Sequence, residues 1–374
     1  MVNDLELAKR ILIADFDHFE NTPFSGGSFK AQVFHAKCDK ILDKLFILKE
    51  GEEWREMRSA VSPIFTSGKL KKMFGVVNEV CADFEAHLRS NVGEEVNARE
   101  VSNKFTVQNM GKLGIGIDVN IFEESQESAL FYKMVRKFMG LDATALDALK
   151  MIIVVFLPAL GNILRIPTFD REAVLFFVDV IQQTMERRKN EQASKQNDMV
   201  ELLAASLRGR DDHDAEVRRQ VEEELETKYT AGKHFEAEDI EDFLVANIFT
   251  ALMLGMETSA LMMSACMCYL ANDPDVQDRL FGEVDEAAPK GAELDYDSIM
   301  KMQYLDMVAN ETMRHLPTND LQRVCNRDYK VPGTDFTIPK GMQVQGRYSI
   351  GKVLAQKIDF DSIFILRNAL NHPF

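Results

Sequence analysis

The chain has 374 residues, 46% hydrophobic and 28% charged, a composition that is typical of globular proteins and excludes disordered and collagen-like classes. Sixty acidic residues against 44 basic ones give a net charge of -16, which argues against nucleic acid as a partner because phosphate backbones require a basic surface. Five cysteines, an odd number at irregular spacings, predict reduced thiols without a disulfide framework. The first fifteen residues mix acidic and basic side chains and predict no signal peptide or N-terminal anchor.

Apolar residues recur at three- and four-residue spacing through most of the chain, which predicts a mainly α fold with a small β part. A Pro-Gly-Thr-Asp turn between two short apolar runs in residues 329–345 predicts a β-hairpin. The charge-dense residues 209–241 are expected to form a solvated surface excursion. We expect helices near residues 4–14, 52–60, 68–90, 98–113, 127–139, 145–164, 171–189, 197–208, 237–271, 274–288 and 298–316.

Residues 243–272 form the most apolar stretch, in which Glu257 is the single charge. Their length suffices for a membrane span, so a single-span membrane protein is one hypothesis. A carboxylate in mid-run and acidic residues at both ends favour instead a long helix that is buried on all sides. Gly255 is expected to weaken this helix, so that the helix either opens there or closely crosses another helix, with Glu257 as a satisfied core residue.

Two short pairs also stand out. Trp54 and Arg58 are four residues apart in EGEEWREMR, so their indole N–H and guanidinium project from one helical face and suit an anionic group. Glu311 and Arg314 are three apart in NETMRHLP, which predicts a buried, hydrogen-bonded ion pair in a helix that Pro317 ends. Each pair also has a purely structural interpretation, as a surface pair or as a helix salt bridge.

Together and in this order, the motifs resemble the cytochrome P-450 family of haem-thiolate monooxygenases. WREMR is similar to the family's W-x-x-x-R segment, LGMETS to its oxygen-binding stretch, and ETMR to its E-x-x-R pair. DFDHF and PIFTSGKLKKMF resemble the microsomal, insect detoxification branch. The resemblance implies an incomplete P-450-like fold over residues 1–344, followed by a divergent tail at residues 345–374.

The resemblance also implies roles for individual residues. Glu257 and Thr258 would be catalytic, with Thr258 hydrogen-bonded to dioxygen and Glu257 helping to relay protons. Glu311 and Arg314 would form a structural pair. A haem would be the cofactor, and the residues that bind it would be Trp54, Arg58, Gly255 and Arg323, the arginines through its propionates.

The family context implies a monooxygenase that inserts one oxygen atom of O2 into small apolar substrates, either xenobiotic or lipid-like. Its partners would be an NADPH-dependent flavoprotein reductase and the substrate, with peripheral membrane contact and no nucleic acid. Its location would be the cytosolic face of the endoplasmic reticulum membrane, although the chain shows no anchor of its own, which favours a cytoplasmic location for the chain alone.

One part of the family pattern is missing. The axial ligand of the haem iron is a cysteine in a loop of the form F-x-x-G-x-R-x-C-x-G, and none of the five cysteines lies in such a loop. Leu254 also replaces a small residue before Gly255. We therefore expect a chain truncated at both ends, without a metal ligand, the first small sheet or the anchor, and inactive as written. The alternative is a non-catalytic helical pseudoenzyme or an unstable fragment.

Overall fold

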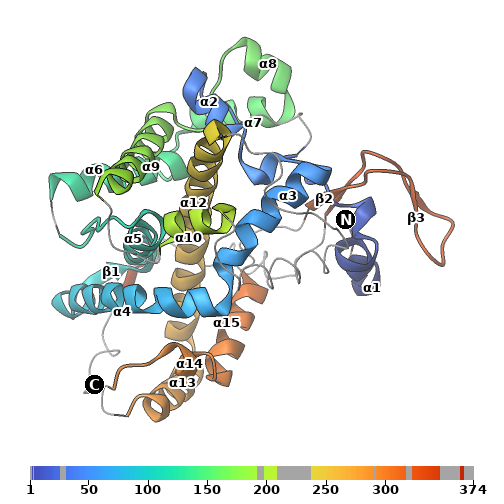
Figure 1. Ribbon diagram of the computed structural model, residues 1–374. Helices are drawn as coiled ribbons and strands as arrows, with labels where there is room; N and C mark the ends of the chain where they lie inside the picture. The colour runs from blue at the N-terminus through green and yellow to red at the C-terminus, as the bar shows by residue number, and fades with distance from the viewer. Residues whose placement is uncertain are drawn as a thin grey trace. The chain divides into compact units, whose positions relative to one another are not determined.

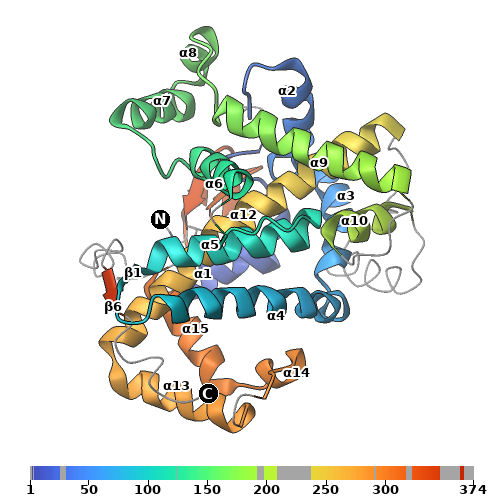
Figure 2. The same cartoon turned by 90° about the vertical axis from the view of Figure 1, so that its left-hand side faces the viewer.

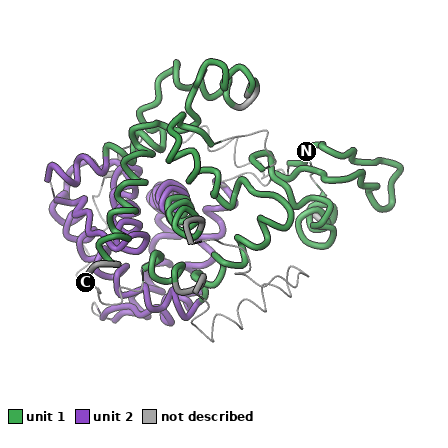
Figure 3. Tube along the Cα trace, turned by 45° about the horizontal axis from the view of Figure 1, so that its top comes forward, with its two compact units in different colours: residues 1–66, 133–251, 320–347 green, residues 67–132, 252–319, 348–374 purple. Residues whose placement is uncertain are grey.

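The structure is a computed structural model, and it is mainly helical with a few short strands, as the sequence predicts (Figure 1). The chain divides into two compact units (Figure 3). Unit 1 comprises residues 1–66, 133–251 and 320–347, and unit 2 the remainder. Pro317 and most of the charge-dense segment and C-terminal tail lie outside the described residues. The structure describes residues 2, 4–25, 31–123, 125–191, 198–208, 237–289, 292–316, 322–345 and 363–365.

Unit 1 contains the helices before residue 67, the helices between residues 133 and 251, and two strand pairs. Its helical elements are α1 (Leu5–Lys9), η1 (Arg10–Ala14), η2 (Phe16–His18), α2 (Ala36–Leu42), η3 (Phe46–Leu48), α3 (Gly51–Val61), η4 (Ser62–Phe65), α7 (Ala145–Phe156), α8 (Pro158–Ile163), α9 (Arg171–Glu191) and α10 (Met199–Arg208). The antiparallel strand pairs are β2 (Gln322–Val324) with β5 (Gln343–Gln345), and β3 (Tyr329–Lys330) with β4 (Thr337–Ile338). The β3–β4 pair confirms the predicted hairpin.

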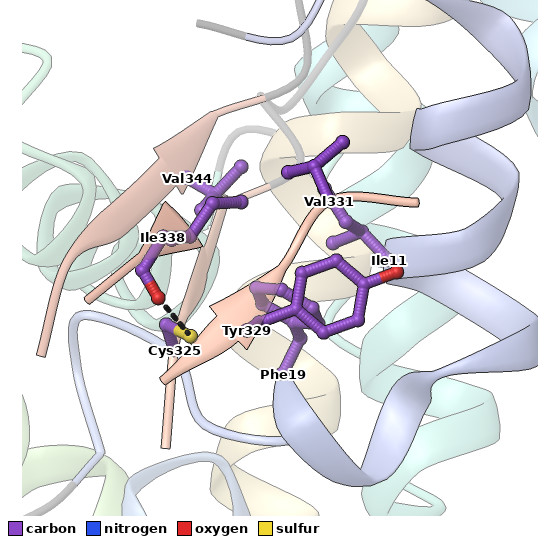
Figure 4. Close-up of a cluster of buried hydrophobic side chains, with 7 residues drawn as sticks. All are labelled: Ile11, Phe19, Cys325, Tyr329, Val331, Ile338 and Val344. Atoms are coloured by element: carbon purple, nitrogen blue, oxygen red, sulfur yellow. Dashed lines mark hydrogen bonds between the residues drawn. The ribbon is translucent and has the colours of Figure 1, made fainter. Parts of the chain in front are cut away.

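A small apolar cluster joins the N-terminal segment of unit 1 to these strands (Figure 4). Tyr329 lies against Phe19 with ring centroids 5.0 Å apart, and its hydroxyl donates to Asp15 Oδ2 at 2.6 Å. The turn between β3 and β4 contains Gly333, whose positive φ of 76° suits a residue without a side chain. The cluster consists of Ile11, Phe19, Cys325, Tyr329, Val331, Ile338 and Val344.

Unit 2 contains α4 and α5, which pack against each other, and the helices that follow the long central helix (Figure 2). Its elements are α4 (Ser67–Ser90), β1 (Glu95–Asn97), α5 (Ala98–Met110), η5 (Gly111–Ile115), α13 (Pro274–Ala287), α14 (Tyr296–Ile299), α15 (Gln303–His315) and β6 (Ile363–Ile365), which pairs antiparallel with β1. Asn97 caps α5 by accepting the Glu100 N–H at 3.0 Å, which places Arg99 in the first turn.

Two helices, α6 (Gln126–Met139) and α12 (Ala237–Asn272), each contribute residues to both units. Residues 243–250 of α12 are buried all round, as predicted. From Leu254 onward the prediction of complete burial is wrong, because one side of the helix is exposed. Leu254, for example, is 50% exposed. Among the described residues, Ile240–Asn272 is the one stretch long and apolar enough to cross a membrane, and 61% of its most apolar window is buried in the protein.

The helix expected over residues 145–164 is in fact two helices. α7 ends at Phe156, Leu157 has non-helical angles (φ -132°, ψ 57°), and Pro158 begins α8. Proline lacks an N–H and disfavours the α conformation in the residue before it, which explains the break. The pair projects at the top of Figure 1, and eight of its large apolar side chains are exposed, namely Leu146, Leu149, Met151, Ile152, Leu157, Leu160, Ile163 and Leu164.

Candidate functional site

Three of the candidate residues form, with one phenylalanine, a chain of ring contacts in unit 1. The Arg58 guanidinium carbon lies 5.2 Å from the centre of the Trp54 ring. Trp54 in turn contacts Phe16, with ring centroids 5.9 Å apart, and the Arg323 guanidinium carbon lies 6.0 Å from the Phe16 ring. The two distances from a guanidinium carbon to a ring are cation–π distances. We call Phe16, Trp54, Arg58 and Arg323 the aromatic–arginine cluster; it joins stretches of the chain that are hundreds of residues apart.

Phe16 is held in this cluster by Arg55, which the sequence did not single out. Arg55 lies on α3 directly after Trp54, and its Nη2 donates to Asp17 Oδ1 and to Glu20 Oε2, each at 2.9 Å. The Arg55 side chain is largely buried, and so is that of Glu20. This double ion pair fastens the segment that carries Phe16 to α3, so Phe16 reaches Trp54 for a reason that local spacing cannot reveal.

The charge of the cluster is positive. Arg58 is exposed, and no described carboxylate pairs with it. Arg323 donates from Nη1 to the Gln322 carbonyl at 2.9 Å, so the backbone of β2 helps to fix the position of its guanidinium group. One guanidinium group over an indole and a second over the neighbouring phenyl ring suit an anionic ligand with planar carboxylates.

Gly255, Glu257 and Thr258 lie in unit 2 on an unbroken stretch of α12, so the helix does not open there. A close crossing is what the structure shows instead. A Cβ atom at Gly255 would lie 2.9 Å from Sδ and Cε of Met110, the last residue of α5. Glycine therefore admits the end of α5 to α12 at this point.

Glu257 is satisfied by an ion pair with Arg99, the second residue of α5. Arg99 Nη2 donates to Glu257 Oε1, and both side chains are largely buried. The Thr258 hydroxyl donates to the Leu254 carbonyl of its own helix at 2.5 Å. The sequence did contain a signal for Arg99, because a cation in the first turn of a helix opposes the helix dipole and needs a carboxylate partner.

Glu311 and Arg314 form the predicted ion pair in unit 2, through two hydrogen bonds of 2.6 and 2.7 Å. The predicted burial is wrong: their side chains are 58% and 55% exposed. His315 Nε2 lies 3.1 Å from Glu311 Oε1. The bonds from Arg314 lower the pKa of Glu311 to about 2, so its carboxylate is charged at neutral pH.

All five cysteines are free thiols, none of them in a disulfide. Cys325 lies in the apolar cluster of Figure 4, where its Sγ donates to the carbonyls of Arg327 at 2.9 Å and Ile338 at 3.7 Å. Burial raises the pKa of Cys325, and likewise that of Cys38 and Cys268. A raised pKa favours the protonated thiol at neutral pH.

Comparison with known proteins gives a consistent result. A family model described as Cytochrome P450 matches residues 1–349. The "Probable cytochrome P450 9f2" of Drosophila melanogaster is 31% identical over 350 residues, covering 91% of this chain and 64% of that protein. Cytochrome P450 6B2 of Helicoverpa armigera is 30% identical over 347 residues, covering 91% and 62%. Cytochrome P450 3A13 of Mus musculus is 29% identical over 307 residues, covering 81% and 56%.

The chain therefore spans less than two thirds of the length of each of these relatives. Insect proteins are among them, in agreement with the resemblance to the insect detoxification branch. The family model extends over nearly the whole chain and over every motif that carries the resemblance. The chain belongs to the cytochrome P450 family.

Proposed function

We propose that this chain derives from a haem-dependent monooxygenase that inserts one oxygen atom of O2 into small apolar substrates, either xenobiotic or lipid-like. The aromatic–arginine cluster is the observation that carries the proposal. Trp54 and Arg323 contact Phe16, and Arg58 lies over Trp54 as an exposed arginine without a described carboxylate partner, which suits an anionic ligand. Haem has two propionates, and bidentate guanidinium groups match carboxylates in geometry and charge.

The residues present fit one half of a haem site. Trp54, Arg58 and Arg323 would hold the propionates, and haem, when bound, supplies the oxidising chemistry. No described cysteine fits the iron, because Cys325 donates its proton within an apolar cluster and the sequence contains no glycine-rich cysteine loop. We therefore propose that the chain as given is inactive.

The residues that α12 contributes to unit 2 would handle protons, by the family resemblance. Arg99 would hold the Glu257 carboxylate in place, and the Thr258 hydroxyl would exchange its present bond to Leu254 for a bond to ligand. Leu254, half exposed on the side of α12 that is not covered, would contact an apolar molecule.

The proposed partners follow from the family and from one surface. The family implies an NADPH-dependent flavoprotein reductase. The apolar residues exposed on α7 and α8 support peripheral contact with the endoplasmic reticulum membrane, because such a patch is costly in water and inserts readily into the headgroup region.

A second function, a non-catalytic helical pseudoenzyme, is favoured by the cysteine geometry described above. A pseudoenzyme of this kind would retain the fold but would not carry out the oxidation, whether or not it binds haem. The two are distinguished by whether haem binds and by what ligates its iron.

Titration of the chain with haem tests the proposal. Arg58→Ala is expected to weaken haem binding about tenfold, because it removes a charge-assisted bond to a propionate. Arg279→Ala is the matched control, since Arg279 also lies over an aromatic ring, 4.2 Å from the centre of Tyr304. Equal loss in both variants, or no saturable binding in the unsubstituted chain, would contradict the proposed propionate site.

A further inference from the structure

Three polar atoms on α5 are buried without a hydrogen-bond partner among the described residues. Two of them, Nη1 of Arg99 and Oγ of Ser102, lie in the first half of the helix, and the third is Oδ1 of Asn109. Ser102 is 0% exposed, so bulk water does not reach its hydroxyl. Unpaired buried polar atoms are rare in native proteins, and they commonly mark an ordered internal water.

The two residues are three apart in a helix, so they lie on the same face, one turn from each other. The other half of the Arg99 guanidinium is already engaged, because Nη2 donates to Glu257. A planar guanidinium presents its two nitrogens to different partners at once. The remaining donor of Arg99 and the hydroxyl of Ser102 together give a water molecule the two polar partners it needs at minimum.

We propose that Arg99 and Ser102 bind one internal water, and that Arg99 with this water holds the Glu257 carboxylate in place. Arg99 is thus a positioning residue. The hydrogen-bonded chain runs from Glu257 through Arg99 and the water to Ser102, all within unit 2. The part that Glu257 plays in proton transfer rests on the proposed function; the water site itself does not.

The sign of one substitution tests the site. If the Ser102 hydroxyl is dry, Ser102→Ala removes an unpaired polar group and raises the melting temperature of the full chain. If the water is bound, the same change breaks its hydrogen bond and lowers the melting temperature by about 2 °C. We expect a fall for Ser102→Ala; a rise overturns the water site.

A double-substitution cycle tests the link to Arg99. With a shared water, Ser102→Ala lowers the melting temperature in the unsubstituted chain but has no further effect on Arg99→Met. Additive effects would show that the two residues do not share a ligand. Should Arg99→Met fail to fold, Arg99→Lys takes its place, because a single ammonium cannot serve Glu257 and the water with the same geometry. Neither readout uses haem, so the water site can fail while the haem titration still supports the proposed function, and the reverse also holds.

Discussion

Gly255 and Gly282 both lie inside helices, where glycine costs about 1 kcal/mol relative to alanine. Nothing lies within 4 Å of a Cβ built at Gly282, so Gly282→Ala is expected to stabilise the protein by about 0.5–1 kcal/mol. A Cβ at Gly255 would press on the flexible end of Met110, and the strain should cancel that gain. Denaturant unfolding of the two variants measures this difference; an equal gain at both sites would show that α5 does not lie close to Gly255.

Sequence reasoning located residues whose partners are near in sequence, and it missed those whose partners are far away. The Glu311 and Arg314 pair follows from a three-residue spacing and is present. Its exposure did not follow from spacing, because burial depends on what packs over a helix. Arg99 lies 158 residues from Glu257, and no helical period connects them.

The hydrogen bond between Asp15 and Tyr329 joins the N-terminal segment to the β3–β4 hairpin. This bond, followed by the ion pair with Arg10, lowers the pKa of Asp15. A carboxyl group with a lowered folded-state pKa adds stability that is fully present above its unfolded pKa of about 4. That stability is lost as pH falls through the lowered folded-state value.

We therefore expect Tyr329→Phe to destabilise the protein at pH 7 and to make its acid loss of stability below about pH 4 shallower. Unfolding followed by circular dichroism between pH 7 and pH 2 measures both effects. Tyr296→Phe is the control, since the ring of Tyr296 contacts Phe74 and its hydroxyl bonds to no described residue. Parallel pH curves for Tyr329→Phe and the unsubstituted chain would contradict the role given to Asp15.

The exposed apolar side chains of α7 and α8 predict that these two helices contact a lipid membrane. Exchanging Ile152 and Leu160 for glutamate should weaken binding to phosphatidylcholine vesicles at least about tenfold, because each buried large side chain contributes about 1.5–3 kcal/mol. Sedimentation with the vesicles measures the binding. Met307→Glu on α15 alters an equally exposed residue elsewhere and should leave it unchanged. If both variants bind alike, the α7–α8 surface has no part in membrane contact.

Helix positions were predictable because they follow from apolar periodicity and caps. α4, expected at residues 68–90, occupies Ser67–Ser90, and α9, expected at 171–189, occupies Arg171–Glu191. The break at Pro158 was visible in the sequence and was underweighted. The strand pairs β2–β5 and β1–β6 were not predicted, since strands of three residues have too few positions to show an alternating pattern.

At the scale of the whole molecule, membership of the cytochrome P450 family is shown, whereas the inactivity of the chain as given is a proposal. The family model extends over residues 1–349, and the aromatic–arginine cluster is assembled in unit 1. The feature that gives the family its chemistry is a thiolate on iron. We propose that the chain as given recognises the porphyrin through its propionates without activating its iron.

The spectrum of the haem-loaded chain, reduced and exposed to carbon monoxide, tests this most directly. We predict saturable haem binding that weakens with Arg58→Ala, together with a carbon monoxide spectrum that lacks the thiolate-type Soret band. A thiolate-type band in the unsubstituted chain would contradict the account, because one of the five cysteines would then have to reach the iron as a thiolate.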